Sequence, residues 1–336
     1  MRQLVAIFSA LALAASAAGW HTDILGEPYK ARYVEHAPDY SGSVRSTIVR
    51  LPSADTSSRR AVLYVHGFND YFFQDSMARA LAGAGYNFYA VDLRKYGRSL
   101  LPGQTPFEVR DISEYYADID SALAQMRADG MRHIALMGHS TGGLITSSYM
   151  ADRRQADNVE AMVLNSPFLD WNESRLNEGL MIPAVRSIAP LFPRLSIPQG
   201  GSTGYARSLL KGYGGSGEWE YDTTWKFPVS PPVQASWIAA IDKAHDQVQR
   251  DPRIMLPILV MHSDSTVQKD DGEDAYNHKD AVLDVRDIDR YGRTLGPDVT
   301  IATVRGGLHD LVLSSPSIRH ATLTQIITFL NRHLPE

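Results

Sequence analysis

The chain has 336 residues, of which 44% are hydrophobic and 21% are charged, and its formal net charge is −5. These values are typical of a globular protein with one large domain or two modest ones. Lys and Arg are not clustered, which argues against binding to nucleic acid, since that function requires a basic face. The chain contains no Cys, so disulfide bonds are excluded.

The N-terminal residues have the features of a secretory signal peptide. Arg2 precedes an apolar stretch over residues 4–15, and residues 15–17 (ASA) fit a small-x-small cleavage site. The apolar stretch is short for a membrane anchor, and no basic stop signal follows it. We therefore expect residues 1–17 to be a signal peptide and the mature protein to be secreted or periplasmic.

Strand and helix patterns alternate along the next part of the chain. Most of the strands are continuous apolar runs, as expected for buried parallel strands. The helices have apolar residues at helical spacing, and Asp111 is a suitable N-cap. In chain order, the expected elements are strand 46–51, strand 61–66, helix 76–85, strand 87–92, helix 112–126, strand 133–137, helix 143–151 and strand 161–164. This alternation predicts an α/β fold with a mostly parallel central sheet flanked by helices.

The regular pattern stops near Ser166. Residues 167–254 are rich in Pro, Gly, Trp and Tyr and contain no buried strand pattern. Regular elements return as strand 257–261, helix 285–291, strand 299–304 and helix 317–334. We therefore expect four parts, which are the signal peptide (1–17), a first part of the core (18–166), an inserted cap (167–254) and a second part of the core (255–336).

The sequence GHSTG at residues 138–142 is a G-x-S-x-G motif between a predicted strand and a predicted helix. In that context the chain reverses sharply and lifts the serine hydroxyl above the sheet. Side chains at Gly138 and Gly142 would collide across the tight turn. We therefore predict that Ser140 is a nucleophile.

A serine hydroxyl is a poor nucleophile until a base takes its proton. His309, in the sequence GGLHDLVL, follows the strand at 299–304 and should lie at the carboxyl edge of the sheet. Other histidines belong to other turns, end a strand or lie near the C-terminus. His309 is therefore the predicted base.

A carboxylate must orient the histidine, and two residues compete for this role. Asp264 directly follows the strand at 257–261, whereas Asp280 comes 16 residues later. A turn, a helix and a strand between acid and base need roughly 25–30 residues. Asp280 lies 29 residues before His309 and Asp264 lies 45 before it. We favour Asp280, with Asp264 as the alternative, and this choice requires an insertion over residues 263–279.

The oxyanion formed during attack on a carbonyl needs two hydrogen-bond donors, usually backbone N–H groups. Thr141 follows the nucleophile at the start of a helix. Phe68 follows Gly67 in the loop after the strand at 61–66. The backbone N–H groups of Phe68 and Thr141 are the predicted donors.

Two other patterns suggest binding sites but are better explained without a ligand. An acidic run is more typical of a solvated loop than of a cation site; its members are Asp270, Asp271, Glu273 and Asp274. Residues 212–217 satisfy G-x-G-x-x-G but follow no buried strand, so a flexible loop is expected. We expect neither a metal nor a cofactor. Four tryptophans in the predicted cap could line an acyl pocket or pack the cap core, namely Trp171, Trp219, Trp225 and Trp237.

Four segments of the chain resemble the α/β-hydrolase superfamily, and within it the monoacylglycerol lipase and lysophospholipase-like group, often labelled serine aminopeptidase S33 type. They are VHGFNDYFF, AVDLRKYGRSL, MGHSTGG and GGLHDLVL, within residues 45–335. Two departures are Lys95, where Gly is common, and HSDST in place of H-G-x-x-D. The resemblance implies an α/β-hydrolase fold and substrates that are mostly carboxylic esters, including acylglycerols and lysophospholipids.

The sequence thus predicts a serine hydrolase that cleaves carboxylic esters through Ser140, His309 and Asp280. Its expected partners are a small-molecule or lipid ester and a lipid surface. One alternative is a peptidase that binds a free amine through carboxylates of the cap, for which Asp170, Glu173 and Glu178 are candidates. Another alternative is a non-catalytic protein that has the same fold and binds a ligand.

Overall fold

The computed structural model describes residues 19–153, 159–173, 177–199 and 203–335. The expected signal peptide lies outside the described residues. Among the described residues, a nine-stranded sheet has the order β1-β2-β3-β5-β4-β6-β7-β10-β11. Its strands are β1 (His21–Thr22), β2 (Lys30–Asp39), β3 (Gly42–Leu51), β4 (Arg60–Val65), β5 (Asn87–Asp92), β6 (His133–His139), β7 (Val159–Asn165), β10 (Ile258–Ser263) and β11 (Val299–Val304).

The sheet has an antiparallel part and a parallel part. Strands β1, β2, β3 and β5 pair antiparallel in that order, whereas β5, β4, β6, β7, β10 and β11 pair parallel. Because the strands from β5 to β11 are parallel, their carboxyl ends share one edge of the sheet. Loops from several of these strands can therefore meet in one place.

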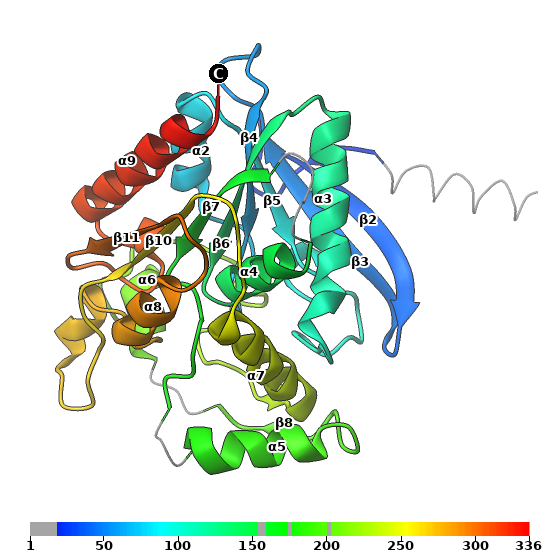
Figure 1. Cartoon of the computed structure of the whole chain (residues 1–336), viewed down its shortest axis with the longest axis vertical. Coiled ribbons are helices and arrows are strands. Elements are labelled where there is room, and N and C mark those ends of the chain that lie inside the picture. The colour runs from blue at the N-terminus through cyan, green and yellow to red at the C-terminus, as the bar shows by residue number, and fades with distance from the viewer. Residues whose placement is uncertain (1–18, 154–158, 174–176, 200–202, 336) are drawn as a thin grey trace, which may run out of the picture.

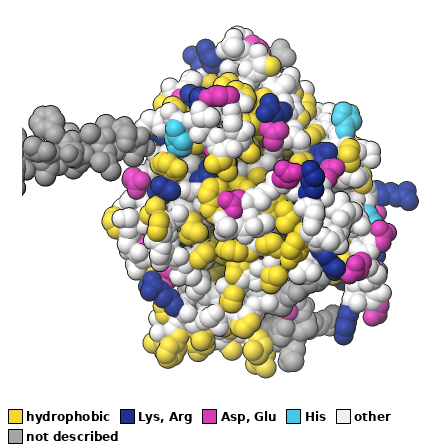
Figure 2. Space-filling view, turned by 180° about the vertical axis from the view of Figure 1, so that it is seen from behind, with side chains coloured by type: hydrophobic (Ala, Val, Ile, Leu, Met, Phe, Trp, Pro, Cys, Tyr) yellow, Lys and Arg dark blue, Asp and Glu magenta, His cyan; other side chains and the backbone are white. Residues whose placement is uncertain are grey.

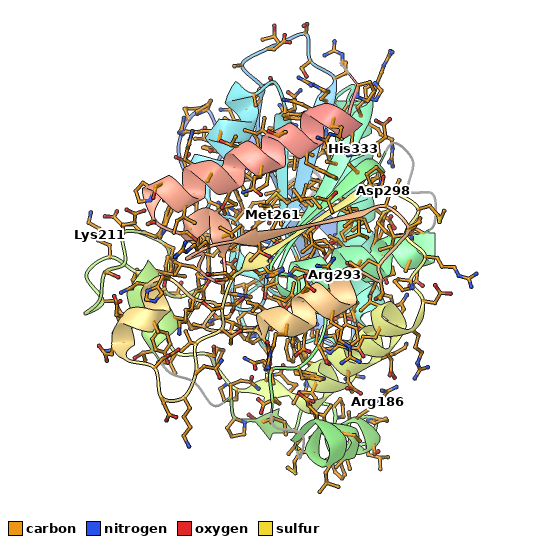
Figure 3. The ribbon with its side chains drawn as sticks, turned by 60° about the vertical axis from the view of Figure 1, so that its left-hand side comes forward. Arg186, Lys211, Met261, Arg293, Asp298 and His333 are labelled. Carbon is orange, nitrogen blue, oxygen red and sulfur yellow. The ribbon has the colours of Figure 1, made fainter. Side chains whose placement is uncertain are left out.

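Helices cover both faces of the sheet, as predicted (Figure 1). Apolar side chains of α2 (Asp75–Gly83) and α9 (Pro316–His333) join one buried cluster. The other face packs against α3 (Tyr116–Ala128), α4 (Thr141–Arg153) and α8 (Val285–Gly292), and α7 (Ala235–Arg250) packs against α4. Figure 3 shows Met261 of β10 between the layer that contains α9 and the layer that contains α8. This three-layer arrangement buries both faces of the parallel strands.

The chain between β7 and β10, residues 166–257, is called here the β7–β10 segment. It contains a π-helical turn (Asn177–Met181), α5 (Ile182–Ile188), β8 (Ser196–Ile197), α6 (Gly204–Leu209), β9 (Val233–Gln234) and α7. Apolar side chains of α7 belong to the same buried cluster as those of α4. Part of the predicted cap is therefore continuous with the packing on one face of the sheet.

The elements predicted between residues 46 and 164 are confirmed to within a few residues. Asp111 is an N-cap, as predicted. It forms a capping box with Glu114 that begins the 3-10 turn Ile112–Tyr115, which leads into α3. The sequence pattern missed β1 and β2 at one side of the sheet, because exposed and charged residues interrupt the apolar alternation of β2 and β1 has only two residues. Among the described residues, no helix is both long enough and apolar enough to cross a membrane.

Candidate active site

Ser140 lies at the junction of β6 and α4, with a left-handed backbone φ of 52°. The turn around it leaves no room for side chains. A Cβ on Gly142 would lie 2.3 Å from the carbonyl oxygen of Val65, and one on Gly138 would lie 2.5 Å from Thr146 Oγ1. Both values are far below a normal contact distance, so the predicted need for two glycines is confirmed. The strained turn presents the serine hydroxyl at the carboxyl edge of the sheet.

Ser140, His309 and Asp280 form one chain of hydrogen bonds. Ser140 Oγ lies 2.9 Å from His309 Nε2, and His309 Nδ1 lies 2.9 Å from Asp280 Oδ2. All three side chains are buried. A carboxylate can only accept, so His309 Nδ1–H donates to Asp280 and Nε2 is left to accept the serine hydroxyl. This arrangement allows His309 to take the proton of Ser140.

Asp280 reaches His309 because a loop returns it to the end of β10. A parallel β-bridge pairs Asp280 with Thr266, just beyond β10. Asp280 Oδ1 accepts the backbone N–H groups of Val282 and Leu283, both at 2.8 Å, which leaves Oδ2 for His309. Asp264 is exposed and accepts the N–H of Gly306 instead. Of the two candidate acids, the structure therefore brings Asp280 to His309.

The predicted oxyanion donors lie beside the nucleophile. Phe68 and Thr141 line the same cavity as Ser140 and His309. The loop before Phe68 passes close to the nucleophile, since a Cβ on Gly67 would lie 3.0 Å from the Cβ of Ser140. Thr141 is the first residue of α4, where backbone N–H groups are free of intrahelical partners. The position of both residues fits the predicted role.

The loop that carries Phe68 is tied to the β7–β10 segment. The side chain of Asn69 makes two hydrogen bonds to the backbone of Phe227, because Oδ1 accepts its N–H and Nδ2 donates to its carbonyl, both at 2.8 Å. Asn69 also has a left-handed φ of 49°. Two residues further on, Tyr71 Oη accepts the N–H of Asp222 at 2.7 Å. Sequence analysis missed these contacts, which join residues about 150 positions apart.

A cavity of about 370 Å³ opens above Ser140. Its walls come from the loops after β4 and β6, from the β7–β10 segment and from the residues around Asp280. Trp171 and Trp237 line the cavity. Trp219 instead donates its Nε1–H to the carbonyl of Leu313, and Trp225 packs edge-on against Tyr71. Two of the four tryptophans of the predicted cap thus line the cavity, and the other two pack the β7–β10 segment against the core.

A buried polar cluster lies next to His309, and sequence analysis did not identify it. Among the described residues, ligand atoms of Asp70, His139 and Asp310 lie within 4.8 Å of one another, a spacing that could hold a metal ion. Protein groups already contact both carboxylates. Lys226 Nζ lies 3.1 Å from Asp70, and the amide of Gln74 lies 3.2 Å from Asp310. The cluster therefore has an internal cation in the Lys226 ammonium group.

Burial favours the neutral form of His139 in this cluster. Burial lowers the pKa of His139 below its usual value, and the opposing effect of Asp310 does not restore it. Its ring lies 4.9 Å from the ring of His309, centroid to centroid. Asp310 directly follows His309 in the chain, which is the one signal in the sequence that could have placed it near the site. Nothing in the sequence around Lys226 indicates its position.

The two ligand-like sequence patterns have structural explanations. In the acidic run, Asp271 pairs with Lys279 at 2.8 Å and Glu273 pairs with Arg207 at 2.7 Å. The glycine-rich residues 212–217 form a turn of the β7–β10 segment after α6, between Leu210 and Trp219, which pair in a β-bridge. They do not connect a strand of the central sheet to a helix.

The family model described as "Serine aminopeptidase, S33" matches residues 56–316 of the chain. The chain belongs to this α/β-hydrolase family. The match spans both parts of the predicted core and the β7–β10 segment between them. It confirms the resemblance on which the sequence analysis relied.

Solved structures with the same fold include two lipases. The structure of monoglyceride lipase from Saccharomyces cerevisiae with a substrate analog has a TM-score of 0.66 and 15% identity, and the alignment covers 90% of this chain and 96% of that one. Monoacylglycerol lipase from Paleococcus ferrophilus has a TM-score of 0.61 and 20% identity, with 84% and 97% of the two chains covered. At these identities the likeness shows the fold alone.

Curated relatives match over a shorter part of the chain. A non-heme haloperoxidase of Rhodococcus erythropolis is 33% identical over 134 residues, which are 38% of this chain and 45% of that protein. The AB hydrolase superfamily protein YisY of Bacillus subtilis is 31% identical over 120 residues, 35% of this chain and 41% of that protein. The chain thus aligns with less than half the length of these relatives.

Proposed function

We propose that the protein is a serine hydrolase that cleaves carboxylic esters. The observation that carries this proposal is the hydrogen-bonded chain from Ser140 through His309 to Asp280, with both links at 2.9 Å, at the base of a cavity. A protein that only binds a ligand has no use for a serine held in a strained turn. The two monoglyceride lipases of the same fold add support for an ester substrate.

In the proposed mechanism, Ser140 Oγ attacks the carbonyl carbon of the ester while His309 Nε2 takes the hydroxyl proton. Asp280 stabilises the imidazolium ion that forms. The N–H groups of Phe68 and Thr141 bind the oxyanion of the tetrahedral intermediate. His309 then gives its proton to the leaving alcohol, and the acyl group remains bonded to Ser140 as an acyl-enzyme. Water activated by His309 releases the acid and restores the serine.

The cavity wall is partly aromatic and partly polar, which supports a substrate with an apolar part and a polar part. Aromatic side chains form much of its wall, among them Phe68, Trp171 and Trp237. A cavity of about 370 Å³ accepts an ester of moderate size, and most such sites have apolar walls with a few polar groups. We propose that the β7–β10 segment, predicted as the cap of residues 167–254, covers this substrate.

A peptidase acting on a free N-terminal amine is the alternative, and the structure gives it less support. Such an enzyme needs an available carboxylate in the cavity to bind the amine. Of the three predicted carboxylates, Glu173 lines the cavity. Asp170 already accepts a hydrogen bond from Gln249. Glu178 already accepts one from the backbone N–H of Glu173. Asp70 also lines the cavity, but Lys226 already pairs with it.

We also propose that the β7–β10 segment contacts a lipid surface. Several large apolar side chains are exposed just before, on and after α5, namely Leu180, Met181, Ile188, Leu191, Phe192 and Leu195. Hydrophobic side chains gather at the lower end of the molecule in Figure 2, where Figure 1 places α5. A continuous exposed apolar surface favours association with an apolar partner. Binding to vesicles of neutral phospholipid, lost in Leu191→Ser/Phe192→Ser, is the expected result.

Residues 1–17 support a secreted or periplasmic location. The location is tested by mass spectrometry of the protein from its native cells. The expected N-terminus is Ala18, and an uncleaved N-terminus would contradict the proposal.

The main test is hydrolysis of p-nitrophenyl esters from acetate to palmitate by wild type and by Ser140→Ala. We expect turnover in wild type and none above background in the variant. Labelling of Ser140 by a fluorophosphonate without turnover of any ester would favour a peptide substrate, which aminoacyl p-nitroanilides would then reveal. If the protein shows no turnover of any ester and no labelling of Ser140, the proposed enzyme function is contradicted and a ligand-binding protein is favoured.

A further inference from the structure

The loop that delivers Asp280 also builds part of the cavity wall. We call residues 267–279, between the two residues paired in the bridge of Thr266 with Asp280, the acid loop. Its base is closed by two backbone hydrogen bonds, because Val267 donates to the carbonyl of Asp280 and Asp280 donates to that of Ser265, both at 2.8 Å. The chain therefore leaves the end of β10 and returns to nearly the same place.

One side chain of the acid loop reaches the cavity. The loop contains a 3-10 turn, Glu273–Asn277, and Tyr276 of this turn lines the cavity together with Ser140 and His309. Tyr205 of α6 lines it as well, and the rings of Tyr205 and His309 are 5.9 Å apart, centroid to centroid. Tyr276 thus lies in the part of the wall formed by α6 and the acid loop.

Gly204 at the start of α6 makes room for the ring of Tyr276. A Cβ on Gly204 would lie 2.4–2.6 Å from three atoms of that ring. Real Cβ atoms do not come so close to another heavy atom, so the ring can occupy this position only because residue 204 is glycine. The φ of Gly204 is not in the left-handed region, which means that the contact, rather than backbone conformation, requires the glycine.

Polar contacts outside the cavity hold the acid loop against the β7–β10 segment. Arg207 of α6 pairs with Glu273 at 2.7 Å, and Ser216 Oγ donates to Asn277 Oδ1. Figure 1 shows the acid loop beside α6, at the side of the molecule away from α3. The position of the Tyr276 ring is therefore set from both sides, by its own loop and by α6.

We propose that Tyr276 is a specificity-determining residue, which limits the size of the substrate group that binds between α6 and the acid loop. The proposal rests on the ester hydrolase function proposed above. A large side chain at a cavity wall excludes groups that would overlap with it, and one methylene group more or less in such a site changes kcat/KM by roughly 10-fold or more. The phenol ring acts by occupying space, so no chemical step passes through it.

The test uses Tyr276→Ala in the full chain with two series of esters. One series varies the acyl group of p-nitrophenyl esters, and the other varies the alcohol of acetate esters. We expect the ratio of kcat/KM for large over small substrates to rise by about 10-fold in one of the two series. The series that responds identifies the part of the substrate that faces Tyr276. Unchanged ratios in both series would overturn the proposal.

Gly204→Ala gives a second, independent test. The added methyl group displaces the Tyr276 ring and changes the same substrate ratio as Tyr276→Ala does. In the double variant, Gly204→Ala has no ring to displace, so the ratio should equal that of Tyr276→Ala alone. Independent effects of the two substitutions, which multiply in the double variant, would show that Gly204 does not act through Tyr276.

Tyr213→Ala is the matched control, since Tyr213 lies in the part of the β7–β10 segment next to the acid loop, is 37% exposed and is not part of the cavity wall. It should leave both series unchanged. Failure of the inference is distinguishable from failure of the proposed function. Turnover that requires Ser140 but does not respond to Tyr276→Ala contradicts only the inference, whereas turnover that persists in Ser140→Ala contradicts the function.

Discussion

The turn around Ser140 and the acid loop place two members of the same site in different ways. Around Ser140, backbone atoms of β4, β6 and α4 are so close that a single added Cβ would overlap with a carbonyl oxygen 2.3 Å away. Asp280 is instead placed by hydrogen bonds, two at the base of the acid loop and two to its own Oδ1. The nucleophile depends on close packing, and the acid depends on directed polar contacts.

This difference has consequences for tolerance to change. Close backbone packing has no alternative arrangement of similar energy, so a small increase in volume must disturb the sheet itself. Hydrogen bonds that close a loop fix its two ends and leave its middle free to vary. We therefore expect substitutions near Ser140 to act on folding and those near Asp280 to act on the reaction.

The largest expected effect is that of Asp280→Asn. The asparagine side-chain oxygen still accepts the N–H groups of Val282 and Leu283, but the carboxylate that stabilises charged His309 is lost. We expect kcat for ester hydrolysis to fall by about 10⁴-fold with little change in the temperature of unfolding. Asp264→Asn is the matched control and should keep wild-type kcat. Equal losses in both variants would contradict the assignment of the acid.

Gly142→Ala should act on stability instead. Its Cβ would overlap with the carbonyl oxygens of Val65 and His66, at 2.3 and 2.4 Å. We expect the free energy of unfolding, measured in urea, to fall by about 3 kcal/mol or more. Gly83→Ala, in α2, has no neighbour within 4 Å of the new Cβ and should change stability by about 1 kcal/mol or less. A stable Gly142→Ala protein would contradict the packing interpretation.

A pH titration tests the burial of His245 in the β7–β10 segment. Burial lowers the pKa of His245 in α7 from 6.5 to about 4, and its Nε2 lies 3.0 Å from the carbonyl of Phe168. Between these pH values the unfolded chain binds a proton at His245 and the folded chain does not, so stability falls as the pH is lowered. At pH 5 this difference in proton binding lowers the free energy of unfolding by about 2 kcal/mol.

His245→Gln removes this titration and keeps a donor for the Phe168 carbonyl. The loss of unfolding free energy between pH 7 and pH 5 should therefore be about 2 kcal/mol smaller in the variant than in wild type. Denaturant unfolding at both pH values measures the difference. Parallel pH profiles of the two proteins would show that His245 is not the group responsible.

The smallest expected effect concerns the loop of Phe68. Asn69→Gly keeps a residue that tolerates a positive φ but removes both hydrogen bonds to Phe227. We expect kcat to fall about 10-fold with unchanged KM, because the N–H of Phe68 is less well fixed for the oxyanion. Arg194→Ala is the control. It breaks the ion pair with Glu108, which joins the β7–β10 segment to the core outside the cavity above Ser140. Similar losses of kcat in both variants would indicate general loosening of the segment.

Much of the core and the Ser140–His309 pair could be predicted because their signals are local. The GHSTG turn carries its own glycines, and buried parallel strands are continuous apolar runs. The choice of Asp280 over Asp264 came from the number of residues that a helix and a strand require. The structure places Asp280 beside His309 because the acid loop returns the chain to the end of β10, so the spacing after Asp280 is ordinary.

The rest of the site depends on contacts between distant parts of the chain. Lys226 reaches Asp70, and Phe227 pairs with Asn69, across 156 and 158 residues. No periodicity or motif in the β7–β10 segment indicates such pairs, and its helices α5 and α6 are too short to give a clear pattern. The strands β1 and β2 were missed for a related reason, since their pairing rather than their apolar content defines them.

The bridge between Thr266 and Asp280 makes the acid loop an exchangeable module. Because the chain enters and leaves the loop at paired backbone positions, we expect that a segment of another length can replace residues 267–279 and leave Asp280 in place. Loops of this kind tolerate insertions at small entropic cost. Evolution or an engineer can therefore alter the cavity by grafting new loops at one junction, while the sheet that holds Ser140 and His309 remains as it is.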